Sequence, residues 1–341
     1  MRDRSTCGRH RTTRTPVRES VATRPPLGVK RKAALSAFAL TFASVFASLH
    51  IGITAHALQP EPADNWSFYV TTTNINTLFT LGKNQGASDA KYGVNSQVFL
   101  DFGGQWQDNS GTKGPLGSPN FSYSQIESLS ENFAWGYWNG TGSDQTTVLT
   151  LAIGTNNGNY VGQNLGVTWG QVVQAVSNWV HGGYQRQITV YGANDIETWG
   201  GARAADVLQW EAGYAQGTSQ PYLNFGSADG CPQYTDNNGS CAGTSGDWNQ
   251  YNYWYLSWGA PPAQSLPEIY NNAQKNQWVQ IDRYGHDYQR DTINFSGPLN
   301  DYYRDSSSFT PAQSWGSMQG GLLYYPYLNA YMPYQDTVLA D

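Results

Sequence analysis

The sequence predicts an α/β fold, a single (β/α)8 barrel of the TIM type that follows an N-terminal export signal. From residue 66 onward, short β-branched and aromatic runs alternate with stretches of helical periodicity. The runs are almost continuously apolar, which is typical of parallel strands covered on both faces. About eight such units fit a barrel, whose usual size is about 250 residues. An open doubly wound sheet is the alternative, but neither of its usual glycine-rich phosphate motifs occurs in the chain.

The elements follow from the spacing of the apolar residues. We expect strands at 66–72, 97–102, 147–153, 187–191, 221–225, 253–258, 278–281 and 292–295. Helical periodicity covers 123–138, 168–180 with Thr168 as N-cap, and 202–215. Pro267 can begin a fourth helix, because proline suits the first helical position. The tail from about residue 301 either closes the barrel or wraps around it. No linker is evident, so residues 58–341 are expected to form one domain.

The first 57 residues have the order of a secretory signal peptide. A basic segment over 1–32 precedes an apolar run over 33–53 and the small-x-small pattern Ala55-His56-Ala57. We expect cleavage after Ala57 and a secreted, extracellular product. The alternative is an uncleaved membrane anchor, because about 20 apolar residues can cross a bilayer. After residue 57 no stable membrane span is expected.

Charge separates this segment from the rest of the chain. Ten of the 19 basic residues precede residue 58, which leaves nine basic and 23 acidic residues, a net charge of −14, from residue 58 onward. Such a chain has no basic face, so nucleic acid is not expected as a partner. A disordered chain would be rich in charge and poor in aromatics. Here charged residues make up 13% and aromatic residues 14%.

Cysteine usage agrees with export. Cys231 and Cys241 lie in a stretch rich in glycine, asparagine and aspartate, and we expect them to form one local disulfide. A metal site needs clustered ligands. His181 and His286, the histidines after residue 57, are far apart in the sequence. We therefore expect neither a metal nor a cofactor.

Polar residues that follow the expected strands are the candidate site residues, because a barrel enzyme places its site at the carboxyl ends of its strands. The candidate catalytic residues are Glu197, Asp195 and Asp101. The candidate substrate-binding residues are Asn224, Asp229, Trp258, Trp199, Trp106 and Asp282. Asp101 can equally be a structural residue at a strand end, Asp282 ranks below it as a site residue, and most tryptophans simply fill the core or its rim.

The pair Asp195-x-Glu197 is the most informative feature. Residues two apart on a strand point to the same side, so both carboxyl groups would face the site. Two adjacent carboxylates cannot both ionise without a large cost, so one has its pKa raised and can donate a proton near neutral pH. Cleavage of a glycosidic bond needs such an acid and a second carboxylate. Alternatively, Asp195 caps the next segment and Glu197 is a solvated loop residue.

A strand that ends in D-x-E, with the glutamate as acid, resembles the chitinase-type and muramidase-type glycoside hydrolases. The segments Gly192–Glu197, Asn224–Pro232 and Ser257–Ala260, together with Pro267-Glu-Ile-Tyr270, are similar to uncharacterised secreted bacterial proteins of the glycoside-hydrolase-like barrel class. The resemblance implies that Glu197 is the acid and Asp195 its neighbouring carboxylate. The longer D-x-x-D-x-D-x-E signature of the chitinase type is absent.

Two functions follow as expectations. The first is a secreted hydrolase that acts on an extracellular polysaccharide, such as a cell-wall or chitin-like glycan, with Glu197 as general acid and Asp101 as its partner. The second is a catalytically silent barrel that binds a glycan or a partner protein at the cell envelope.

Overall fold

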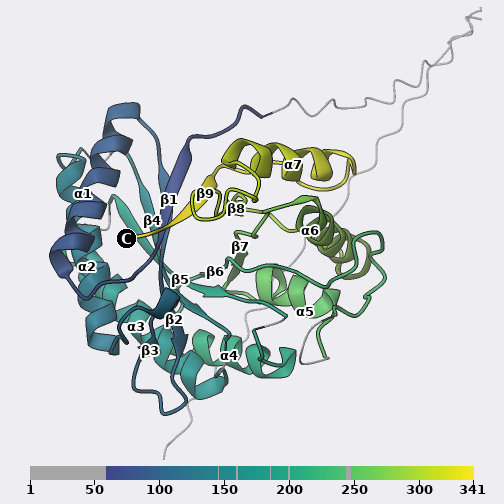
Figure 1. Cartoon of the computed structure of the whole chain (residues 1–341), viewed down its shortest axis with the longest axis horizontal. Coiled ribbons are helices and arrows are strands. Elements are labelled where there is room, and N and C mark those ends of the chain that lie inside the picture. The colour runs from purple at the N-terminus through teal and green to yellow at the C-terminus, as the bar shows by residue number, and fades with distance from the viewer. Residues whose placement is uncertain (1–58, 145, 159, 185, 199, 243–246) are drawn as a thin grey trace, which may run out of the picture. The chain divides into compact units, whose positions relative to one another are not determined.

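The computed structural model describes residues 59–341, except for 145, 159, 185, 199 and 243–246 (Figure 1). The signal peptide expected over 1–57 lies outside the described residues. Within the described part, no helix is both long and apolar enough to cross a bilayer.

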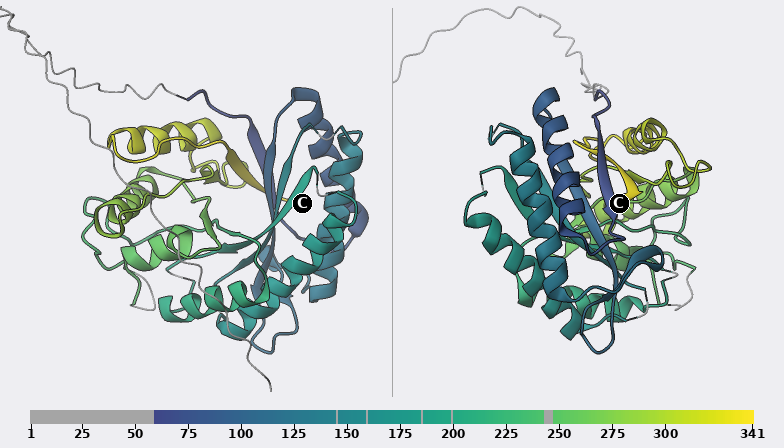
Figure 2. Two further views of the ribbon diagram at one scale, coloured as in Figure 1. Left: turned by 180° about the vertical axis from the view of Figure 1, so that it is seen from behind. Right: turned by 60° about the vertical axis from the view of Figure 1, so that its left-hand side comes forward.

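Eight parallel strands form one curled sheet, with the helices outside it (Figures 1 and 2). Its order is β7-β6-β5-β4-β2-β1-β9-β8, so each of these strands pairs with the next one along the chain, except that β7 does not pair with β8; β9 also pairs with β1. The strands are β1 (Asp64–Tyr69), β2 (Ser96–Gln105), β4 (Leu149–Asn156), β5 (Ile188–Asp195), β6 (Tyr222–Asn224), β7 (Ala263–Ser265), β8 (Leu299–Asn300) and β9 (Gln335–Ala340). A short ninth strand, β3 (Thr112–Lys113), runs antiparallel to the end of β2.

The sheet is a half-barrel, because no ladder joins its two edge strands, β7 and β8. Two isolated parallel bridges lie along this interruption, between Ser265 and Phe295 and between Glu268 and Leu299. Two hydrogen bonds form the bridge between Glu268 and Leu299. The amide of Ile269 donates to the carbonyl of Leu299 at 2.9 Å, and the amide of Leu299 donates to the carbonyl of Pro267 at 2.8 Å. We call this interruption the β7–β8 seam.

A helix occupies each of the seven connections between these eight strands. They are α1 (Ile75–Tyr92), α2 (Tyr123–Gly140), α3 (Gln163–His181), α4 (Ala204–Gly217), α5 (Gln250–Trp254), α6 (Asn272–Tyr284) and α7 (Pro311–Leu323). Short π-helical segments, Tyr255–Gly259 and Gly285–Gln289, continue α5 and α6, and a 3₁₀ turn covers Pro115–Gly117. Local capping fixes several starts: Ser122 and Thr310 each form a reciprocal capping box with the glutamine three residues later.

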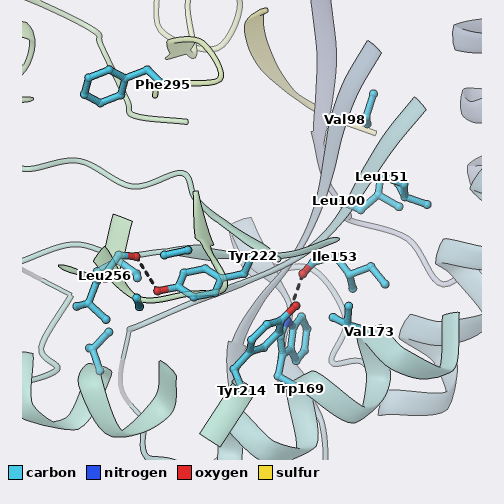
Figure 3. Packing of buried hydrophobic residues seen from close by; sticks show 14 of the residues in the cluster. Val98, Leu100, Leu151, Ile153, Trp169, Val173, Tyr214, Tyr222, Leu256 and Phe295 are labelled. Carbon is cyan, nitrogen blue, oxygen red and sulfur yellow. Dashed lines mark hydrogen bonds between the residues drawn. The ribbon is translucent and has the colours of Figure 1, made fainter. Parts of the chain in front are cut away.

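The curled sheet separates two apolar clusters. The inner cluster contains Phe99, Leu223, Phe225 and Leu299, and the rings of Phe99 and Phe225 stack at 4.2 Å. The larger cluster lies between the sheet and the helices, and several of its buried aromatic residues form hydrogen bonds through their polar atoms. Trp169 Nε1 donates to the carbonyl of Ile153 at 3.1 Å, and the Tyr222 hydroxyl donates to that of Leu256 at 2.6 Å (Figure 3).

The parallel α/β architecture and the first five strands are confirmed, with small shifts at their ends. The single disulfide is confirmed too, between Cys231 and Cys241. The helix expected from Thr168 begins earlier, after Gly162, so Thr168 lies inside α3. The tail from residue 301 supplies both an outer helix, α7, and the strand β9 that pairs with β1.

Four expectations in the second half of the chain are wrong. Residues 253–258 are helical, in α5 and its π-helical continuation, and 278–281 lie within α6. Pro267 does not begin a helix, since α6 starts at Asn272 and Pro267 is in the extended segment after β7. Of 292–295, Phe295 alone pairs, in an isolated bridge.

Candidate functional site

Three carboxyl groups meet at the carboxyl end of the curled sheet. Asp195 is the last residue of β5, Glu197 follows two residues later, and Glu268 follows β7. One oxygen of each lies within 4.8 Å of the others. We call these three side chains the carboxylate cluster. The predicted pair Asp195 and Glu197 is therefore together, and its third member comes from the segment at the β7–β8 seam.

Glu197 is held by the neighbouring loops on both sides. Its amide donates to Asn157 Oδ1 at 3.1 Å, and Asn157 Nδ2 donates back to its carbonyl at 2.9 Å. The hydroxyl of Ser227, which follows β6, donates to Glu197 Oε1 at 3.1 Å. Only 9% of Glu197 is exposed. A side chain fixed in this way has little freedom to leave the site.

Glu268 is equally constrained. Its amide donates to the carbonyl of Gly226 at 3.2 Å, and the bridge to Leu299 holds the other side of its backbone. The Tyr270 hydroxyl donates to Glu268 Oε1 at 2.7 Å. The residue is 5% exposed. Because Tyr270 occupies one carboxyl oxygen, the other oxygen is the one available to a ligand.

Tyr69 and Asp101 border the cluster from β1 and β2, where they are paired in register. Asp101 is buried, and its Oδ1 accepts from the amide of Gly103 at 2.8 Å. The guanidinium of Arg304 lies 4.6 Å from the centre of the Tyr69 ring. This end of the sheet therefore combines several acidic groups with one nearby cation.

Burial and mutual repulsion raise the pKa values of these acids. Burial is the main cause at Asp195, where the pKa lies well above its usual value, and the charges of Glu197, Glu268 and Asp101 add to it. The pKa of Glu268 is raised well above its usual value by burial and then by the charge of Glu197. Burial raises the pKa of Asp101 to about 6. The carboxylate cluster therefore keeps its protons to a higher pH than isolated carboxyl groups would.

The same three carboxylates could hold a cation. Their oxygens are close enough to share one ion, and carboxylate oxygens are the ligands that Ca²⁺ prefers. A cation there would stabilise the ionised forms that burial disfavours. The cluster is therefore able to bind either protons or a hard metal ion.

A pocket of about 300 Å³ opens between the β2–β3 hairpin and the end of β4. Trp106, Lys113, Asn156 and Tyr160 are among its lining residues. Asn156 pairs in register with Asp195, so the pocket begins one strand away from the cluster. A second hollow of about 610 Å³ shares Trp106 and Tyr160 and continues outward. We call these joined hollows the Trp106 pocket.

Asn224 and Asp229, the two candidate substrate-binding residues at and after the end of β6, have different positions relative to the carboxylate cluster. Asn224 ends β6, but its side chain is fully buried and holds loops: Nδ2 donates to Ser257 Oγ at 2.8 Å, and Oδ1 accepts from the amide of Gly226 at 3.1 Å. Asp229 lies close enough for its charge to raise the pKa of Glu268. Asn224 thus supports the site, whereas Asp229 borders it.

Asp282 and Trp258 do not reach the carboxylate cluster as expected. Asp282 lies in α6, is fully buried, and accepts from the amide of Ile293 at 2.7 Å. Trp258 lies in the π-helical segment after α5 and lines a pocket near the amino ends of the strands. Both errors come from assigning strands to helical segments. Trp199 lies outside the described residues.

Sequence reasoning missed Glu268 and Tyr270 as site residues. The available signal was their spacing: Glu268-x-Tyr270 repeats the two-residue alternation of Asp195-x-Glu197. Reading Pro267 as a helix start concealed it.

Comparison with known proteins adds no relative. A scan against protein-family models finds no match, and a search of curated proteins finds no significant match.

Proposed function

We propose that the protein is a secreted glycoside hydrolase of the (β/α)8 class that cleaves an extracellular polysaccharide by carboxylate acid/base chemistry. The observation that carries the proposal is the carboxylate cluster: the buried Glu197 and Glu268 and the half-buried Asp195 have oxygens within 4.8 Å of one another at the carboxyl end of the curled sheet. The strand order, in which β9 returns to pair with β1, supports the barrel class.

Glu197 is proposed as the general acid and Glu268 as the second carboxylate. Asp195 is proposed to carry a proton beside this pair, because one of its oxygens is buried without a hydrogen-bond partner among the described residues. Its proton therefore offsets the charge of the pair and can be returned to Glu197 during turnover. Glu268 takes the role that the sequence assigned to Asp101, which borders the site.

The spacing favours a retaining mechanism. Inverting enzymes separate their carboxyl groups by about 6.5–9.5 Å to admit a water molecule, whereas retaining enzymes hold them about 5–5.5 Å apart. Oxygens of Glu197 and Glu268 lie within 4.8 Å. In this scheme Glu268 attacks the anomeric carbon while Glu197 protonates the leaving oxygen. Water then cleaves the glycosyl–enzyme bond, with Glu197 as base.

The Trp106 pocket supports a polymeric substrate. It extends from the strand next to Asp195 to two aromatic rings, Trp106 and Tyr160, and aromatic faces suit the C–H surfaces of sugars. A chain cut at the cluster would place its neighbouring sugar units there. A cell-wall or chitin-like glycan has this repeating form.

The test is hydrolysis of a panel of cell-wall, chitin-like and plain glucan polysaccharides by the wild type and two variants. Glu197→Gln and Glu268→Gln should each lower kcat at least about 100-fold. Glu211→Gln is the matched control, since it makes the same change at a buried glutamate on α4 and should leave kcat unchanged. Full activity in either cluster variant would refute its role.

Two further measurements separate the roles of the pair. A glycoside with an activated aryl leaving group needs little protonation, so Glu197→Gln should retain far more activity on it than on the polysaccharide. Glu268→Ala should lose activity on both, and azide, a small external nucleophile, should restore turnover of the aryl glycoside. The reverse pattern would exchange the two roles.

Glycan binding without turnover is the second candidate. The low exposure of Glu197 and Glu268 favours it, because a polymer must reach both to be cut. In that case the wild type and the Glu197→Gln variant would bind one polysaccharide of the panel with equal affinity. Neither protein would release reducing ends from it.

A further inference from the structure

A second pocket, of about 500 Å³, lies near the amino ends of the strands, at the opposite end of the curled sheet from the carboxylate cluster. Residues near the starts of β2 and β4 line it, together with the segments that lead into β8 and β9. We call it the amino-end pocket. Its volume lies in the range of about 300–1,000 Å³ that is typical of ligand sites, whereas the inside of a barrel is normally packed with side chains.

The lining of the amino-end pocket is aromatic and polar but uncharged. Trp258, Tyr191, Tyr331 and Tyr334 contribute rings, while Gln264 and Asn329 contribute amides, and none of its lining residues is acidic or basic. The end of the sheet that holds the carboxylate cluster is acidic, whereas this lining carries no charge. A charged ligand would need an opposite charge in the pocket to offset its desolvation, so the lining disfavours charged ligands. A neutral ligand with both apolar faces and hydroxyl groups matches the lining.

Several polar groups of the lining have capacity for a ligand. Within the part of the chain that the structure describes, the side chains of Tyr191, Tyr334 and Gln264 make no hydrogen bond. Their exposure is intermediate, so they are accessible from the pocket. The amide of Gln264 can both donate and accept, as can the two phenols, which is the pattern that vicinal sugar hydroxyls require.

Two aromatic rings of the amino-end pocket, those of Trp258 and Tyr331, differ in how firmly they are held and in how exposed they are. Trp258 is fixed, because its Nε1 donates to Asp291 Oδ2 at 3.1 Å. Tyr331 stands at the rim and is 61% exposed. A fixed ring inside and an exposed ring at the entrance provide surfaces against which a chain of sugar rings can stack.

We propose that the amino-end pocket is a second, non-catalytic binding site for a neutral saccharide chain. It does not depend on the hydrolase activity, because its residues belong to the other end of the sheet. Such a site would hold the protein on a polymer while the carboxylate cluster acts on it.

The test is isothermal titration of the chain from residue 58 onward with neutral oligosaccharides of two to six units. Glu197→Gln and the double variant Glu197→Gln/Tyr331→Ala are compared, so that turnover does not interfere. Tyr331→Ala should weaken binding at least 10-fold, and so should Trp258→Ala. Tyr331 is the decisive position, because a side chain so exposed can be removed without loss of folding. An oligosaccharide of uronic acids should bind at least 10-fold more weakly than a neutral one of equal length.

Two controls locate the binding. Tyr234→Ala removes another highly exposed tyrosine, which lies in the disulfide loop and does not line the amino-end pocket, and should leave affinity unchanged. Trp106→Ala alters the Trp106 pocket and should leave the amino-end contribution intact. The proposal is overturned if no neutral oligosaccharide binds, or if binding is lost with Trp106→Ala and unaffected by Tyr331→Ala. Neither outcome decides whether the protein is a hydrolase.

Discussion

Replacing Asp101 with asparagine should stabilise the protein, and the gain should depend on pH. Asp101 is 1% exposed, and burial raises its pKa from 3.8 to about 6. A buried acid with a raised pKa favours folding while it is protonated and loses that advantage as the pH rises through its folded pKa. The asparagine has the same shape, remains neutral, and can still accept the hydrogen bond from Gly103.

The magnitude follows from the two pKa values. One pKa unit corresponds to 1.36 kcal/mol, so the difference between 3.8 and about 6 amounts to about 3 kcal/mol once both states are ionised. Relative to the wild type, Asp101→Asn should therefore gain less than about 1 kcal/mol in the free energy of unfolding at pH 4 and about 3 kcal/mol at pH 8. Most of the change falls between pH 4 and 6.

Urea unfolding followed by tryptophan fluorescence at pH 4, 5, 6 and 8 measures this difference. Asp305→Asn is the matched control: this exposed acid has its pKa lowered by the amide of Ser307, so its replacement should bring no gain at pH 8. A gain for Asp101→Asn that is the same at every pH, or a loss at pH 8, would refute the reasoning.

Three further predictions concern packing, the disulfide and metal dependence. A methyl group at Gly82 would overlap the carbonyl oxygen of Phe133 where α1 crosses α2, so Gly82→Ala should cost about 1–3 kcal/mol in urea unfolding, and a neutral result would contradict this close contact. Replacing both Cys231 and Cys241 with serine should cost about 3 kcal/mol, measured in the same way, because a closed loop of this length restricts the unfolded chain by about that much. Hydrolysis should be unchanged by EDTA, because the proposed mechanism uses the cluster as acids, whereas a loss restored by Ca²⁺ would show that it works as a metal site.

The first half of the chain could be predicted from its sequence because its strands are long. β2, β4 and β5 have eight to ten residues each, and their apolar runs end in polar residues that mark the carboxyl end. Asp101, Asp195 and Glu197 were found for this reason. Their positions follow from the alternation of side chains along a strand, which needs no tertiary information.

The second half offered a misleading pattern. Residues 253–258 are aromatic-rich and favour a strand by composition, yet Asn249 caps a helix there, and its side chain accepts from the amide of Asn252 at 2.9 Å. Conversely, β7 and β8 have three and two residues, too few to show alternation. Their pairing depends on the rest of the sheet, and for this reason Glu268 could not be placed beside Glu197 from the sequence.

The β7–β8 seam gives the residues of the carboxylate cluster different backbone supports. Asp195 ends a strand that is paired on both sides, whereas Glu268 lies in a segment held by separate hydrogen bonds to Gly226 on one side and to Leu299 on the other. The position of Asp195 is therefore set by two continuous ladders, whereas the position of Glu268 depends on a few individual hydrogen bonds from both edges of the interrupted sheet.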